Sequence, residues 1–177
     1  MKILKLALFI LPIWLSPVSV VRPQEPASPE LQRLAERIER SIERDHPDWR
    51  LERIAPITSS ENILIDQWRF GDNSIRMSLV AHRSHVEATE AIQRFARDMR
   101  AAEEVRDLAE GGYWFGIDRA ELTFIKGKIT AYLTSATEIG LDPYVTHTKD
   151  SNSRTSDKRT IATDLARHAA QEIDSQE

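Results

Sequence analysis

The chain has 177 residues, of which 41% are hydrophobic and 29% are charged, and its formal net charge is −4. These proportions are typical of a globular protein with one domain. Lysine and arginine are interspersed with acidic residues, which argues against a nucleic-acid partner. The absence of cysteine excludes disulfides, thiol catalysis and cysteine-bound metal.

The N-terminal segment, residues 1–21, has the layout of a secretory signal peptide. Two lysines precede an apolar stretch, Leu6–Leu15, and small residues follow it. We therefore expect export to the periplasm or the exterior. A short membrane anchor is the alternative, because no A-x-A cleavage pattern is present, and membrane contact is expected only in that case. Residues 22–27 form a proline-rich spacer before a single domain at 28–177.

A helix is predicted to begin after Ser28. Serine is a good N-cap, and Pro29 suits the first helical position. His46-Pro47 should end the helix, because the residue before proline avoids the helical conformation. Its apolar residues follow helical spacing and form one stripe: Leu31, Leu34, Ala35, Ile38 and Ile42.

Three strands are expected next, at 49–57, 63–70 and 74–82. Pro56 makes the first of them an edge strand or a broken one. Alternation of apolar and polar residues favours a hairpin with Asp72-Asn73 at its tip. That register places Arg69 directly opposite Arg76, where like charges are unfavourable unless an anion or an acid joins them.

A second helix should follow the capping box formed by Ser84 and Glu87. Gly111-Gly112 is then interpreted as a chain reversal. The buried stripe expected for this helix comprises Val86, Ile92, Phe95, Ala96, Met99 and Ala102.

Three more strands are predicted at 113–117, 121–126 and 128–134, with Lys126-Gly127 as a two-residue turn. An even loop before the second of these would pair Ile117 with Leu122 and turn Trp114 away from the helices. A polar loop is expected at 136–155. A third helix should start at Ser156, with a buried stripe at Ile161, Leu165, Ala169 and Ile173.

These elements predict an α+β fold. We expect a single antiparallel sheet of about six strands, in two halves of three strands and a helix, with the helices packed on one face and an amphipathic helix in front. The strand order between the two halves does not follow from the sequence.

The sequence contains no specific catalytic, nucleotide or metal motif. His82, His85 and Glu87, with a ligand such as His147, could hold a metal only if local geometry brought them together, so we expect neither a metal nor a cofactor. Asp66 should lie on the core face beside Leu79. A hydrolase-type enzyme with a dispersed site around Asp66, His82 and His85 is therefore an alternative function.

The outward face of the sheet is the favoured binding surface, because it combines aromatic residues with arginines. Its expected residues are Trp114, Gly116, Tyr132, Arg69 and Arg76. The sequence thus favours a non-enzymatic exported domain that binds a partner protein or a small ligand. Two alternatives stay open. In one, the protein is a membrane-tethered accessory subunit of an envelope complex. In the other, the first helix or the polar loop simply covers the outward face, which then binds nothing.

Overall fold

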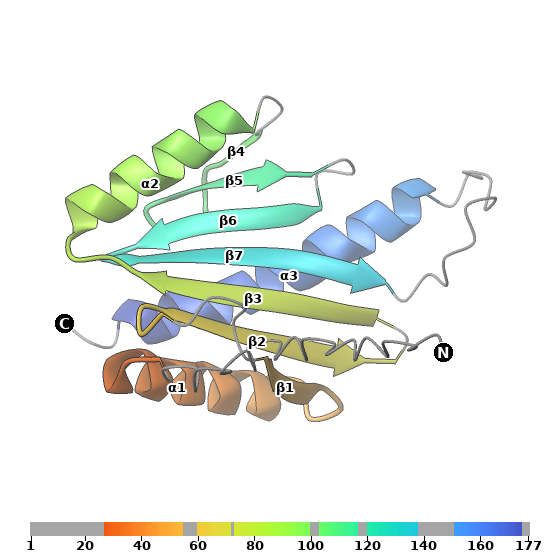
Figure 1. The fold of residues 1–177 in the computed structure, drawn as a ribbon. Helices are drawn as coiled ribbons and strands as arrows, with labels where there is room; N and C mark the ends of the chain where they lie inside the picture. Colours follow the sequence, from red (N-terminus) through yellow and green to blue (C-terminus); the bar gives the residue numbers. More distant parts are fainter. Residues whose placement is uncertain are drawn as a thin grey trace, which may run out of the picture.

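The computed structural model of the chain describes residues 27–54, 60–71, 73–99, 103–116, 120–137 and 151–174. The signal peptide or anchor predicted at 1–21 lies outside this part. The α+β class is confirmed, since the described residues form three helices and one antiparallel sheet of seven strands (Figure 1). The helices are α1 (Pro29–Asp45), α2 (His85–Asp98) and α3 (Ser151–Asp174). The strands are β1 (Arg50–Ile54), β2 (Ile63–Phe70), β3 (Asn73–Ala81), β4 (Glu103–Val105), β5 (Gly111–Phe115), β6 (Glu121–Lys126) and β7 (Ile129–Thr137).

The strand order is β1-β2-β3-β7-β6-β5-β4. The two halves of the chain are thus joined through β3 and β7, which pair along nine residues of each strand. β1 lies at one edge, as the proline near its end suggested, and the additional strand β4 lies at the other. β4 has only three residues, EEV, too few for an alternating pattern to predict it.

The helices do not all pack on one face, which corrects that part of the prediction. α1 and α3 pack against each other, and they share a core cluster with one side of the sheet. α2 packs on the opposite side, where Ala88 and Ile92 contact Ile125. Figure 1 shows α3 crossing behind the strands and α2 at the other end of the sheet from α1. α2 therefore covers the part of that side formed by β6 and β7.

The main core lies between the sheet and the pair α1 and α3. Trp68, Phe124 and Leu165 are among its largest fully buried side chains. Each such side chain stabilises the fold by roughly 1.5–3 kcal/mol relative to leaving it in water. The predicted stripes of the first and third helices face this core, with Ile161 only partly buried.

Both ends of α1 form as predicted. The Ser28 Oγ accepts a hydrogen bond from the Leu31 N–H at 3.3 Å, and Pro29 occupies the first turn. The His46 N–H donates to the carbonyl of Ile42 at 2.7 Å and ends the helix. These contacts satisfy backbone groups that a helix end leaves without partners.

Several predicted boundaries are wrong. The first strand begins at Arg50, and its predicted last residues, 55–57, lie outside the described part. Gly111-Gly112 begin β5 instead of reversing the chain. The predicted loop at 136–155 is strand up to Thr137 and helix from Ser151, so the third helix starts earlier than Ser156. The remaining loop residues, 138–150, lie outside the described part. In α2, Val86 and Met99 are exposed, and Ala88 takes the place of Val86 in the buried face.

No helix among the described residues is long and apolar enough to cross a membrane.

Candidate functional site

Trp114 does not lie on the outward face. It is only 8% exposed and belongs to the core cluster with α1 and α3, and the Arg159 guanidinium lies 4.9 Å from its ring centre. The prediction failed because the observed register pairs Trp114 with Leu122, whereas the expected register paired Ile117 with Leu122. A shift by an odd number of residues reverses both faces of a strand.

Gly116 and Tyr132 do not share a surface with Trp114 either. Gly116 ends β5 with a φ of +83°, and an added Cβ would lie 3.0 Å from the Glu121 side chain. Tyr132 lies on the α2 side of the sheet, half-buried, with its ring 5.3 Å from that of Phe95. Gly116 is therefore explained by backbone conformation, and Tyr132 borders the area that α2 covers.

Arg69 and Arg76 lie on the α2 side, as predicted, but they do not face each other. Arg76 pairs with Gln67 across the β2–β3 hairpin, and its Nη2 donates to Oε1 of Gln67 at 3.4 Å. Arg69 donates from Nε to Glu52 at 2.9 Å. The register differs from the predicted one by two residues, which changes the partners and keeps the faces.

We call the side chains of β2 and β3 on the α2 side the open face: Ile65, Gln67, Arg69, Arg76, Ser78 and Val80. Of the described helices, α2 lies on this side, and it contacts β6 and β7, of which β7 is the direct neighbour of β3 (Figure 1). Ile65 and Val80 are half-buried, while Arg69 and Arg76 are exposed. The open face thus places apolar side chains beside accessible guanidinium groups.

The two histidines of the predicted H-x-x-H motif serve separate structural contacts. His82 Nε2 lies 2.9 Å from Oγ1 of Thr130, and burial lowers the pKa of this histidine, against a smaller opposing effect of Glu87. His85 Nδ1 lies 2.9 Å from the carbonyl oxygen of Gly127. These contacts tie the start of α2 to β7 and to the β6–β7 turn.

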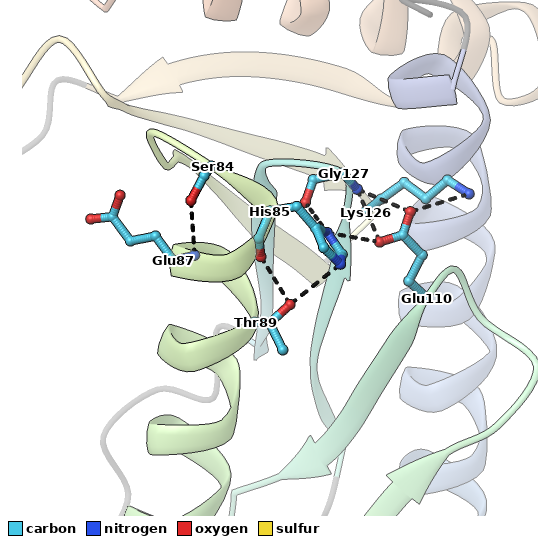
Figure 2. A network of polar contacts seen from close by, with 7 residues as sticks. All are labelled: Ser84, His85, Glu87, Thr89, Glu110, Lys126 and Gly127. Atoms are coloured by element: carbon cyan, nitrogen blue, oxygen red, sulfur yellow. Dashed lines mark hydrogen bonds and ion pairs between the residues drawn. The ribbon is translucent and has the colours of Figure 1, made fainter.

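Glu110 completes this arrangement (Figure 2). Its carboxylate accepts from the Gly127 N–H at 3.2 Å, forms an ion pair with Lys126 at 3.9 Å and lies 3.3 Å from Nδ1 of His85. Glu87 accepts from the backbone N–H of Arg83, as a capping acid does. These contacts fix the β6–β7 turn and the start of α2. His82 and His85 bind different partners, so their ring nitrogens do not form one metal site.

Asp66 is the most deeply buried acid of the described residues. Its side chain is 1% exposed, and the Nε of Arg53 donates to it at 2.9 Å. Burial raises the pKa of Asp66, and the hydrogen bond and charge of Arg53 only partly oppose this. Asp66 lies opposite Met77, not Leu79, on the α1 and α3 face, whereas His82 contacts Thr130 on the other face. The structure therefore does not bring Asp66, His82 and His85 into one site.

A polar cluster that we did not predict lies between α1 and α3. His46, Asp164 and His168 have ligand-type atoms that all lie within 4.8 Å of one another, and theirs is the one such group of metal-ligating side chains found in the described part of the chain. His46 Nε2 is 2.8 Å from Oδ2 of Asp164. The cluster also includes Ser41, whose hydroxyl lies 2.9 Å from Nδ1 of His168.

A sequence signal for this cluster exists but is weak. Asp164 and His168 are four residues apart, the spacing that stacks side chains on one helix face. His46 was interpreted only as the end of a helix. Nothing in the sequence brings 46 near 164, because that contact depends on how α1 and α3 pack.

Ser41, His168 and Asp45 also follow one another like a nucleophilic triad, with His168 Nε2 3.7 Å from Asp45 Oδ2. Ser41 is only 5% exposed, and it lies in the interface between the two helices. A hydroxyl in that position cannot reach a substrate, so the arrangement does not support serine catalysis.

Comparisons with protein-family models, with curated proteins and with solved structures find no match for this chain. The functional argument therefore rests on the geometry of the chain itself.

Proposed function

We propose that the protein is an exported, non-enzymatic binding domain that recognises an extended, acidic segment of a partner protein through the open face. The single observation that carries this proposal is the position of Arg76. Its side chain is exposed on the open face, and its hydrogen bond to Gln67, at 3.4 Å, is long.

The neighbours of Arg76 suit a peptide better than a small ion. Ile65 and Val80 offer apolar surface on either side of Ser78, which lies in the same strand as Arg76. Tyr132 pairs with Ser78 across β3 and β7 and adds an aromatic edge. Interfaces commonly combine such apolar contacts with arginine, which binds carboxylates in a planar, bidentate manner.

Charge complementarity favours an acidic partner. The outward side chains of β1, β2 and β3 include Arg50, Arg69 and Arg76, against one acid, Glu52. Glu52 already pairs with Arg69 at 2.9 Å. An acidic segment would place its carboxylates beside Arg76 without displacing that pair, and its apolar residues would cover Ile65 and Val80.

Peptide selection tests this proposal. A library of random nine-residue peptides should yield binders that combine acidic with apolar residues. Arg76→Ala should weaken them about 10- to 150-fold, as expected for one charge-assisted contact of about 1.5–3 kcal/mol. Arg33→Ala is the matched control, since Arg33 is exposed on α1, on the other side of the sheet. Selected peptides without acids, or equal losses in both variants, would exclude this function.

Export needs its own measurement. N-terminal sequencing of the protein recovered from outside the cytoplasm should give a new start near residues 20–28. An intact start at Met1 would instead favour the membrane-tethered alternative.

A further inference from the structure

We propose that α1 and α3 together bind one divalent transition-metal ion of the zinc type through His46, Asp164 and His168, and that Asp45, which lies outside this group but 3.7 Å from His168, moves in as the fourth ligand. This site is on the opposite side of the sheet from the open face, and the inference does not depend on the proposed function.

The fold holds the three main donors in place. His46 follows the last residue of α1, and its ring stacks on Trp49 with 4.4 Å between ring centres. Trp49 in turn stacks on Phe70 at the end of β2, again at 4.4 Å. Asp164 and His168 project from the same face of α3, one turn apart. The donors are therefore supported by packed elements and not by a loose surface loop.

The distances suit a tetrahedral ion. Zinc binds nitrogen and oxygen at about 2.0–2.2 Å, which separates neighbouring ligand atoms by roughly 3.3–3.5 Å. His46 Nε2 and Asp164 Oδ2 are now 2.8 Å apart, and the donor atoms of the three residues span no more than 4.8 Å. An ion would open that hydrogen bond by about half an ångström and draw His168 inward by about one. Side-chain rotations of this size do not require α1 or α3 to move.

Ser41 gives His168 a support typical of metal-binding histidines. A ligating histidine usually donates its second ring N–H to a neighbouring oxygen, which fixes the ring. Here Nδ1 lies 2.9 Å from the buried hydroxyl of Ser41. With the proton on Nδ1, the lone pair of Nε2 points toward the cluster, where it lies 3.7 Å from Oδ2 of Asp45. His168 itself is 8% exposed, so its ring is shielded from water.

The donor types select the metal. Two imidazoles with carboxylates suit zinc and its neighbours in the transition series, whereas calcium and magnesium prefer all-oxygen sites. Arg44 donates to Oδ1 of Asp45 at 2.9 Å and to Oδ2 at 3.4 Å. The shorter contact is therefore with Oδ1, whereas Oδ2 is the oxygen that lies 3.7 Å from His168. The carboxylates of Asp45 and Asp164 together match the charge of a divalent ion.

Zinc titration of the untagged full chain by calorimetry is the direct test. We expect one zinc per chain, no binding of magnesium, and a melting temperature about 5–10 °C higher when zinc exceeds its dissociation constant a hundredfold. Asp164→Asn and His168→Gln should each weaken zinc binding more than a hundredfold. Ser41→Ala, which removes only the support of the ring, should weaken it by about 10- to 100-fold.

His85→Gln is the matched control, because His85 is an exposed histidine on α2 and lies outside the cluster. This variant should bind zinc like the unaltered protein. Unchanged zinc affinity in both Asp164→Asn and His168→Gln, or a loss in His85→Gln, would overturn the proposal. Cobalt provides a measurement that needs no variant: the unaltered protein should give the intense visible bands of tetrahedral Co²⁺, and the weak spectrum of an octahedral ion would contradict the site.

Discussion

Replacing Arg53 by alanine should destabilise the protein strongly, although Arg53 is partly exposed. The substitution leaves Asp66, with its side chain 1% exposed, without the guanidinium that donates to it at 2.9 Å. It also removes the cation 3.7 Å from Glu39, so that two acids on α1 and β2 face each other without compensation. Breaking a buried ion pair by removing one partner typically costs about 3–5 kcal/mol.

The exposure of Arg53 reduces this figure. Its side chain is 44% accessible, so water screens part of the interaction and hydrates part of the gap that alanine leaves. We therefore expect a loss of about 2–3 kcal/mol in the free energy of unfolding at pH 7. For a chain of this size the melting temperature should fall by about 5–10 °C. Urea unfolding followed by tryptophan fluorescence measures the loss, since Trp68 is fully buried on the same strand as Asp66.

The pH dependence has a definite sign. Burial raises the pKa of Asp66 above its ordinary value of 3.8, so the folded state takes up a proton more readily than the unfolded state. The contribution of Asp66 to stability is thus full below 3.8 and is lost as the pH rises through its folded-state pKa. Arg53 is the group that lowers this pKa, so Arg53→Ala raises it further. The defect of that variant should shrink between pH 7 and about pH 5.

The variant Asp66→Asn distinguishes the free-energy cost of burying the Asp66 charge from the stabilisation by its ion pair with Arg53. The asparagine has the same shape, keeps an oxygen for the Nε of Arg53 and carries no charge to desolvate, so it should lose at most about 1 kcal/mol. The double variant should be more stable than Arg53→Ala alone. A loss in Asp66→Asn as large as that in Arg53→Ala would refute the reasoning, because it would mean that the ionic attraction itself stabilises the fold.

Substitutions at three further positions, Trp114, Gly112 and Ser84, test the core, the sheet and a helix cap, each by urea unfolding. Trp114→Ala should cost about 3–5 kcal/mol, because the ring is 8% exposed in the core; a change below about 1 kcal/mol would support the outward orientation. Gly112→Ala should cost about 1–3 kcal/mol, since its Cβ would lie 2.7 Å from the Thr123 carbonyl oxygen. Ser84→Ala should cost about 1 kcal/mol by removing the cap on the Glu87 N–H, and Ser84→Asn should restore most of it.

The sequence predicted element types well, because they depend on local chemistry. Ser28 and Ser84 cap their helices as expected, and the alternation in β3 assigned Ile75 and Met77 correctly to the core. Both predicted hairpins kept the correct faces but were displaced by two residues. In each hairpin, the last paired residues enclose a two-residue turn whose first residue is glycine. The φ angle is +55° at Gly71 and +53° at Gly127. Glycine is favoured there because its φ is positive.

The failure at Trp114 has a different cause. The connection between β5 and β6 is not a tight turn, since the last pair is Phe115 with Glu121. A longer connection does not fix whether the register is odd or even, so alternation within β5 could not decide which face Trp114 takes. The close approach of Gly112 to the Thr123 carbonyl likewise depends on backbone atoms of another strand and has no signal in the local sequence.

The two proposed sites lie on opposite sides of the sheet and share no residue. The zinc ligands belong to α1 and α3, whereas Arg76 projects from β3 on the side of α2. One physical link exists, the stack from His46 through Trp49 to Phe70, and Phe70 is next to Arg69 of the open face. If zinc orders that stack, peptide affinity should respond to zinc through β2, and Asp164→Asn should abolish the response without changing the affinity measured in a chelator. If peptide affinity does not respond to zinc, the Arg76 and Asp164 variants still test the two sites separately.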